Sequence, residues 1–303
     1  MNKPTTTYRS IRISLISLLF TFFLTFSISS VTFSQSQGEQ YITHGPKNGT
    51  LIIIGGGLLD ATIYDEFKKQ AGSDSAKIVV IPTAMDDNYL QHDSSFSQIK
   101  KNFASYGFSD ITIMHTRDTS ESNRESFLAP LEAASGVYFL GGRQWRLADA
   151  YLNTKVQEEL FKLLERGGVI AGSSAGATIQ GSYLARGDTK NNQIMMGDHE
   201  KGLGFLTNVA IDQHVMVRNR QFDLFDILQR YPYLLGIGLD ENTAIVVKGD
   251  EFKVIGKSYV LIYDQSFWSR EGSELKHLPE KDKLFYILRK GDKYNLSERK
   301  VMK

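Results

Sequence analysis

The stretch GGVIAGSSAGA, residues 167–177, decides the fold and is also the first pointer to function. Its first half contains an apolar run, Val169–Ala171, that predicts a buried strand. The second half turns through Ser174, which has a glycine two positions away on each side, Gly172 and Gly176, and a helix-compatible segment follows. Only small neighbours let a backbone turn so tightly. The stretch therefore predicts a strand–turn–helix unit that presents Ser174 as a nucleophile.

Working outward, four more short apolar runs are typical of strands buried on both faces: Leu51–Ile54, Ile78–Ile81, Ile111–Met114 and Val137–Leu140. Between the strands, longer segments carry apolar residues at helical spacing: 60–70, 90–105, 122–134 and 145–165. This alternation predicts an α/β fold with a mostly parallel central sheet and helices on both faces. Ligands of such sheets bind at the carboxyl ends of the strands, so the loops that follow the strands are where a site is expected.

Beyond about residue 205 the pattern changes to short strands separated by glycine-containing turns. Strands are expected at Ala210–Gln213, Leu234–Leu239, Thr243–Val247, Lys253–Ile255 and Tyr259–Tyr263, with a helix near Gln221–Arg230. Such turns favour antiparallel hairpins that finish the sheet. Neither an internal repeat nor a linker is visible, which predicts one domain over 35–303 with its core at about 48–265. The ends of this domain, 35–48 and the tail after 290, are expected to be loose.

The first 34 residues have the parts of a secretory signal. Lys3, Arg9 and Arg12 precede an apolar and hydroxylic run from Ile13 to Val31, and small residues follow at Thr32 and Ser34. An uncleaved anchor is the alternative, because about 20 apolar residues can span a bilayer. Serine and threonine within the run favour cleavage. We therefore expect an exported chain, periplasmic or extracellular, with no stable membrane insertion once the signal is removed.

The composition limits the chemistry. The 303 residues are 41% hydrophobic and carry a formal net charge of +1. The chain therefore lacks the excess of basic residues that is typical of nucleic-acid binding proteins. Cysteine is absent, so a thiol nucleophile and a thiolate metal site are excluded. A side-chain nucleophile must then be serine or threonine. Neither a metal cluster nor a cofactor motif is visible, and we expect no metal and no cofactor.

A serine nucleophile needs a base, normally a histidine that a carboxylate orients. Of the six histidines, His214 is the best candidate because it directly follows an expected strand, and His115, at the end of another strand, is the alternative. Asp240 and Glu241 end a third strand. Neighbouring strand residues point to opposite faces, so only one of these two carboxylates can face His214. The residues alone leave that choice open.

Acyl transfer also needs backbone N–H groups that stabilise negative charge on oxygen. Ala175, directly after the serine, can donate one, and Gly142 in the segment FLGGRQ (139–144) can donate a second. Another glycine loop, Gly55–Gly57, lacks the spacing and the Gly-Lys-Ser/Thr ending of nucleotide-binding loops. We expect that loop to form a wall of the pocket.

Together these motifs resemble the cyanophycinase family of serine peptidases, to which aspartyl dipeptidase (peptidase E) is related. The resemblance rests on motifs that follow one another in order: GGRQ at 141–144, GSSAGA at 172–177, DQH at 212–214 with Arg218 and Arg220, and GIGLDE at 236–241. It implies a three-layer α/β/α fold of the glutamine-amidotransferase type. By analogy it also makes Ser174 the nucleophile, His214 the base and Glu241 the acid.

The resemblance further implies a set of side chains that line the substrate pocket: Gln144, Gln213, Arg218 and Arg220. Guanidinium groups pair bidentately with carboxylates. This suits cyanophycin, a polyaspartate with arginine on its β-carboxyls, from which the family releases β-aspartyl-arginine dipeptides. One position departs from the family pattern, because Asp223 stands where the pattern has an arginine three residues beyond Arg220. This reversal of charge bears on which substrate the pocket holds.

The predicted function is therefore an exported serine peptidase that hydrolyses aspartyl amide bonds through an acyl-enzyme on Ser174. Its expected partner is a peptide or polymer with aspartyl carboxylates, nucleic acid is not expected, and a homodimer stays open. The alternatives are an aspartyl dipeptidase of the peptidase E type and a non-catalytic exported binding protein that keeps the pocket. An ordinary α/β-hydrolase fits less well, since its triad runs Ser…Asp/Glu…His along the chain, whereas here histidine precedes the acid.

Overall fold

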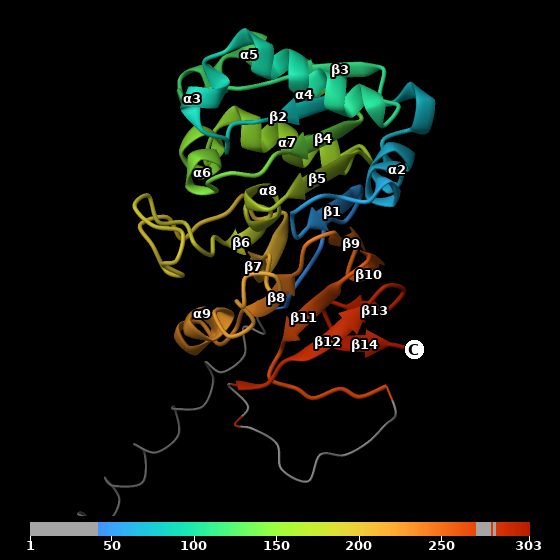
Figure 1. Cartoon of the computed structure of the whole chain (residues 1–303), viewed down its shortest axis with the longest axis vertical. Coiled ribbons are helices and arrows are strands. Elements are labelled where there is room, and N and C mark those ends of the chain that lie inside the picture. The colour runs from blue at the N-terminus through green and yellow to red at the C-terminus, as the bar shows by residue number, and fades with distance from the viewer. Residues whose placement is uncertain (1–41, 271–279, 281–282) are drawn as a thin grey trace, which may run out of the picture. The chain divides into compact units, whose positions relative to one another are not determined.

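The computed structural model describes residues 42–270, 280 and 283–303 (Figure 1). The expected signal segment, 1–34, lies outside the described residues. Within the part of the chain that is described, no helix is both long and apolar enough to cross a membrane.

The larger of two sheets has nine strands in the order β14-β13-β10-β9-β1-β5-β4-β2-β3. Five of them are parallel: β1 (Thr50–Ile54), β2 (Lys77–Ile81), β3 (Asp110–Ile113), β4 (Gly136–Phe139) and β5 (Val169–Ser173). Figure 1 shows them as the blue-to-green strands between β1 and β3. They coincide with the five apolar runs, so the predicted α/β fold with a parallel core is confirmed.

Helices cover both faces of these strands because the strand residues alternate between two buried clusters. In β1, Leu51 and Ile53 belong to one cluster, whereas Ile52 and Ile54 belong to the other. The first cluster is closed by α5 (Glu125–Ala133), α6 (Trp145–Tyr151) and α7 (Lys155–Glu165), and the second by α2 (Ala61–Gln70) and α4 (Asp93–Ser105). The result is three layers, α/β/α.

Three helical segments expected to be continuous are interrupted. The segment 145–165 forms α6 and α7, because Asn153 between them has a φ of 58°, in the left-handed region. The other two segments begin with a separate short helix: α3 (Asp87–Leu90) precedes α4, and the 3-10 helix η2 (Glu121–Asn123) precedes α5.

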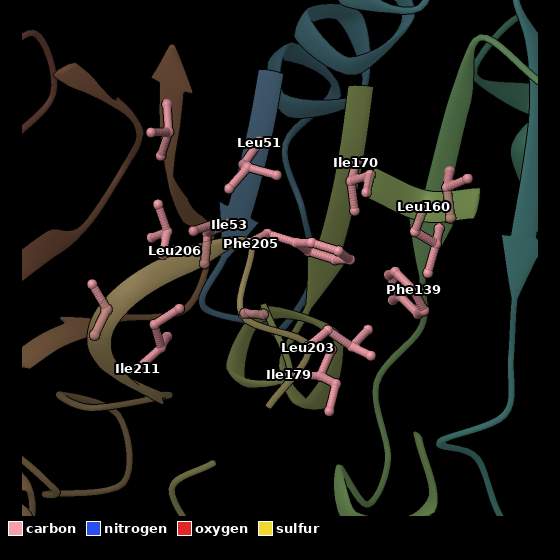
Figure 2. Packing of buried hydrophobic residues seen from close by; sticks show 14 of the residues in the cluster. Leu51, Ile53, Phe139, Leu160, Ile170, Ile179, Leu203, Phe205, Leu206 and Ile211 are labelled. Atoms are coloured by element: carbon pink, nitrogen blue, oxygen red, sulfur yellow. The ribbon is translucent and has the colours of Figure 1, made fainter. Parts of the chain in front are cut away.

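A second sheet, which was not predicted as separate, has five strands in the order β12-β11-β8-β7-β6. Its strands are β6 (Gly181–Tyr183), β7 (Leu206–Gln213), β8 (Leu235–Leu239), β11 (Tyr259–Tyr263) and β12 (Tyr286–Arg289). One face joins the first cluster, and Figure 2 shows Leu206 and Ile211 of β7 together with Leu51 and Ile53 of β1. The other face packs against α9 (Leu224–Arg230). The polar ends of β7 and β8 are thereby held close to the large sheet.

Antiparallel strands complete the large sheet, as predicted: β9 (Thr243–Lys248), β10 (Glu251–Gly256), β13 (Lys293–Asn295) and β14 (Lys300–Met302). The expectation of a loose tail after 290 is wrong, because β13 pairs with β10 and Tyr294 is fully buried. The described part of 35–48 is also held in place. Thr43 is buried, and the carbonyl of His44 accepts a hydrogen bond from the backbone N–H of Thr207 at 3.0 Å.

Candidate active site

Ser174 lies at the turn between β5 and the short helix α8 (Ala175–Thr178). Its φ of 57° and ψ of −113° fall outside the regions that residues with a side chain favour. Glycine on both sides makes this turn feasible. A Cβ on Gly172 would lie 2.1 Å from the carbonyl oxygen of Gly176, and a Cβ on Gly176 would lie 2.3 Å from that of Phe139. The glycine spacing therefore reflects close backbone contacts around a strained serine.

Three side chains form a continuous chain of hydrogen bonds. Ser174 Oγ lies 2.8 Å from His214 Nε2, and His214 Nδ1 lies 2.5 Å from Glu241 Oε1. A carboxylate only accepts, so Nδ1 carries the imidazole proton and Nε2 is left to accept from the serine hydroxyl. The structure thus brings together Ser174, His214 and Glu241 from the ends of β5, β7 and β8.

Asp240, the other carboxylate that the sequence offered, has different partners. Its Oδ1 accepts the backbone N–H groups of Met216 and Val217, both at 3.0 Å. Its Oδ2 accepts the hydroxyl of Ser258 at 2.5 Å. Asp240 therefore fixes the chain that follows His214.

His115, the alternative base, lies elsewhere, with its Nδ1 2.9 Å from Thr83 Oγ1. His199 bridges two carboxylates, since its Nε2 lies 2.6 Å from Asp149 and its Nδ1 lies 3.0 Å from Asp198. Among the described residues, no group of three histidine, cysteine or acidic side chains is placed to hold a metal ion.

The end of β1 connects the three segments of the triad. Three consecutive carbonyls, those of residues 54–56, accept backbone N–H groups from Ser174, His214 and Asn242 at 2.9, 3.1 and 2.9 Å. Asn242 directly follows the triad carboxylate. One strand end therefore sets the relative positions of segments that lie far apart in the sequence.

The glycine loop after β1 packs directly on the triad side chains. A Cβ on Gly56 would lie 2.3 Å from His214 Cε1, and a Cβ on Gly57 would lie 2.4 Å from Glu241 Oε2. Both glycines have a positive φ, 109° and 75°. The loop forms a wall of the site, and any side chain at these two positions would displace the histidine or the carboxylate.

The two expected oxyanion donors adjoin the serine. Ala175 begins α8, and the first N–H groups of a helix have no partner within it. On the other segment, Gly141 passes so close that its Cβ would lie 3.2 Å from Ser174 Cβ. The next residue, Gly142, has a φ of 143°, and a Cβ there would lie 2.0 Å from the carbonyl oxygen of Ala84. Only glycine fits this path beside Ser174.

The electrostatic surroundings favour a neutral histidine. Burial lowers the pKa of His214, the hydrogen bond with Glu241 opposes this, and the positive charges of Arg218 and Arg220 lower the pKa further. The net shift is downward, which favours the neutral imidazole, whose Nε2 can accept a proton.

Comparison with known proteins identifies the family. The family model of peptidase family S51 matches residues 51–255, more than half of the chain. The chain belongs to this family. A cyanophycinase of Trichormus variabilis is 30% identical over 84% of this chain and 88% of the relative, and one of Geminocystis herdmanii is 30% identical over 81% and 93%. The predicted resemblance is confirmed, and the chain is a peptidase of the cyanophycinase or peptidase E type.

A solved structure supports the fold. The crystal structure of a peptidase from an acI-B1 Actinobacterium aligns with a TM-score of 0.60 at 22% identity, over 83% of this chain and 98% of that one.

Two glutamines that the resemblance assigns to the substrate pocket of this S51 peptidase are buried and bound to the protein. Gln144 Nε2 donates to the carbonyls of Ala185 and Arg186 at 2.8 and 2.9 Å. Gln213 Oε1 accepts from Arg220 Nη1 at 3.2 Å. Both side-chain amides therefore stabilise neighbouring segments of the site by hydrogen bonds to the protein.

The two arginines differ in exposure. Arg218 is exposed, whereas Arg220 is only 4% exposed and donates to the carbonyl and the side-chain oxygen of Gln213. Among the described residues, no carboxylate forms an ion pair with either arginine. Asp212 and Asp223 are near enough for their charges to raise the pKa of Arg220, against the larger lowering by burial, although neither forms an ion pair with it.

Sequence reasoning missed Arg186, a deeply buried charge near the site. This side chain is 1% exposed and forms a bidentate pair with Asp212, at 2.8 and 2.9 Å, and a further ion pair with Asp223. The departure from the family pattern at 223 thus lies against a buried cation. The sequence gives one faint signal, an arginine directly after the apolar pair Leu184 and Ala185, and it does not reveal the partners.

Proposed function

We propose that this S51 peptidase is an exported serine peptidase of the cyanophycinase type, which hydrolyses aspartyl amide bonds. One observation carries the proposal: Ser174 Oγ, both ring nitrogens of His214 and Glu241 Oε1 are joined by hydrogen bonds of 2.8 and 2.5 Å. This is the arrangement by which a histidine activates a serine and a carboxylate orients the histidine.

The chemistry follows from the geometry. His214 Nε2 takes the hydroxyl proton as Ser174 Oγ attacks the carbonyl carbon of the amide, and Glu241 stabilises the imidazolium that forms. The N–H groups of Ala175 and Gly142 stabilise the oxyanion. His214 then returns the proton to the leaving amine, which departs from the acyl-enzyme. A water molecule, deprotonated by the same histidine, hydrolyses the ester.

The charges beside the triad support an acidic substrate. Arg220 is buried without an anionic partner among the described residues, and Arg218 is exposed nearby. A substrate carboxylate would pair with these guanidinium groups and give Arg220 the direct ion pair that it lacks. An aspartyl residue supplies that carboxylate next to the scissile amide, whether it belongs to a polymer of the cyanophycin type or to an aspartyl dipeptide.

A non-catalytic binding protein is the rival proposal, and the site geometry argues against it. A protein that only binds gains nothing from a strained serine, φ 57°, or from a histidine whose pKa is held below its usual value.

The test is hydrolysis by the chain from residue 35 onward, with cyanophycin, β-aspartyl-arginine and a panel of aspartyl dipeptides as substrates and mass spectrometry of the products. We expect release of dipeptides or free aspartate. Ser174→Ala should lower the rate of hydrolysis by at least about 10⁴-fold. Ser173→Ala is the matched control, since it removes a hydroxyl from the same turn. Undiminished hydrolysis by Ser174→Ala contradicts the mechanism, and inactivity of the unaltered chain on every substrate supports the binding protein.

Export is tested separately by cell fractionation and by sequencing the N-terminus of the protein. We expect the mature chain outside the cytoplasm with an N-terminus near residue 35. A cytoplasmic protein that still begins at Met1 would contradict this part of the proposal.

A further inference from the structure

A cluster of four charged side chains lies beside the triad, and only one of them, Arg220, has a role in the proposed function. It consists of Arg186, Asp212, Arg220 and Asp223. Arg186 holds Asp212 by two hydrogen bonds, 2.8 and 2.9 Å, and also binds Asp223. Arg220 is near enough to this group that the charge of Arg186 lowers its pKa, after the larger effect of burial.

Hydrogen bonds join the cluster to residues that the resemblance assigns to the substrate pocket. Asp212 immediately precedes Gln213, whose carbonyl and side chain bind Arg220. The backbone N–H of Asp223 donates to the carbonyl of Arg220 at 3.0 Å. On the other side, the carbonyl of Arg186 accepts from Gln144. Of the four side chains that the resemblance assigns to the substrate pocket, Arg220 belongs to this cluster, and Gln144 and Gln213 are bonded to it.

The members of the cluster differ in accessibility. Asp212 is 1% exposed and serves as a permanent counter-ion, whereas the side chain of Asp223 is 34% exposed. Asp223 is thus the carboxylate that a bound ligand meets from the solvent side. Its interaction with Arg186 is the one that a substrate carboxylate would make if residue 223 had no charge.

Charge balance gives the consequence. Two guanidinium groups face two carboxylates, so the cluster is neutral before any substrate binds. A first substrate carboxylate can pair with Arg220 and the exposed Arg218. A second one would need Arg186, which is already bound on both sides, and it would approach the negative charge of Asp223.

We propose that Asp223 is a specificity-determining residue: it occupies a second carboxylate subsite at Arg186, so that the pocket accepts one acyl-side carboxylate and rejects a second. This inference rests on the proposed function, because it assumes that the pocket of Arg218 and Arg220 takes the acyl part of the substrate.

The experiment compares two probes that differ by one carboxylate: N-acetyl-aspartate, with two, and its α-amide, with one. Binding is measured by calorimetry on the chain carrying Ser174→Ala, so that no turnover interferes. Adding Asp223→Asn should improve the binding of the two-carboxylate probe relative to the other by roughly tenfold, the size of effect expected of one partly exposed charge at short range. Asp223→Glu keeps the charge and should leave the ratio unchanged.

Asp226→Asn is the matched control, since Asp226 is an exposed carboxylate on α9 that lies outside the cluster. It should not change the ratio. Near-UV circular dichroism checks folding, and Asp223→Ser replaces the asparagine variant if that variant does not fold. An unchanged ratio in the variants that lack the charge, or an equal change in Asp226→Asn, overturns the inference.

This experiment separates the inference from the peptidase proposal. If the unaltered chain hydrolyses no aspartyl amide but the Asp223 variants change the binding ratio, the peptidase proposal fails and the subsite inference stands. If the chain is a peptidase and the ratio does not respond, the inference alone fails.

Discussion

Replacing Gly56 by alanine should disable the site and leave the fold in place. The added Cβ would lie 2.3 Å from Cε1 and 2.7 Å from Nε2 of His214, whereas ordinary contacts of a Cβ begin at about 3.4 Å. The imidazole must therefore move by about 1 Å. The distance from His214 Nε2 to Ser174 Oγ, 2.8 Å in the structure, would then exceed the length of a hydrogen bond.

The size of the effect can be worked out from this displacement. Moving a catalytic group by about 1 Å lowers the rate roughly 100-fold, and complete loss of the base lowers it by up to about 10⁶. We expect kcat of Gly56→Ala to fall by at least about 100-fold. The φ of 109° adds backbone strain, which should lower the free energy of unfolding by about 1–3 kcal/mol.

Gly72→Ala is the matched control. Gly72 has a φ of 106°, and its added Cβ would meet nothing closer than Ser75 Oγ, at 3.3 Å. This variant should lose similar stability in urea unfolding and keep its kcat for aspartyl peptides. Full activity of Gly56→Ala, or an equal loss of activity in Gly72→Ala, would show that the glycine loop does not position the histidine.

Three further predictions test the electrostatics. The proposed mechanism requires neutral His214, so activity should fall as the pH decreases through a pKa below the ordinary 6.5. Arg218→Ala removes a positive charge that lowers this pKa, so it should move the acidic limb of the kcat/KM profile to higher pH. An unmoved limb would contradict the assignment of His214 as the base. Asp212→Asn removes the bidentate partner of Arg186, a side chain that is 1% exposed. The free energy of unfolding, measured in urea, should fall by about 3 kcal/mol, and a change below about 1 kcal/mol would mean that stability does not depend on this pair. Glu241→Gln should keep the thermal midpoint and lower kcat by about 10⁴, because the neutral amide does not stabilise the imidazolium and its NH2 group can hold the histidine in the wrong tautomer; a normal rate would remove Glu241 from the triad.

The parallel strands and the serine turn were predictable because both depend on local sequence. Runs such as Ile78–Ile81 must be buried on both faces, and glycine at 172 and 176 leaves little but a tight turn around Ser174. The residues also narrowed the acid to Asp240 or Glu241. Resemblance favoured Glu241, and the structure places that residue against His214.

The features that could not be predicted from the sequence depend on contacts between distant segments. The second sheet forms because β7 and β8 pair with each other instead of joining the large sheet, and nothing within either strand specifies its neighbour. β12 did leave a signal, the inward alternation of Tyr286 and Leu288, whereas β13 and β14 have three residues each, too few for a pattern. The pairing of Arg186 with Asp223 was equally hidden, since opposite charges far apart in a sequence have many candidate partners.

The three carbonyls of residues 54–56 also have a consequence for folding and for evolution. They lie at and just after the end of β1, the earliest strand in the described part of the chain, yet the serine, the histidine and the residue after the acid reach them only when β5, β7 and β8 have been made. During folding, the geometry of the site should therefore form late and in a single step. On heating, it should be lost in the same transition as the large sheet. Inserting or deleting one residue at this strand end would misplace all three segments, and no single compensating substitution elsewhere could restore them.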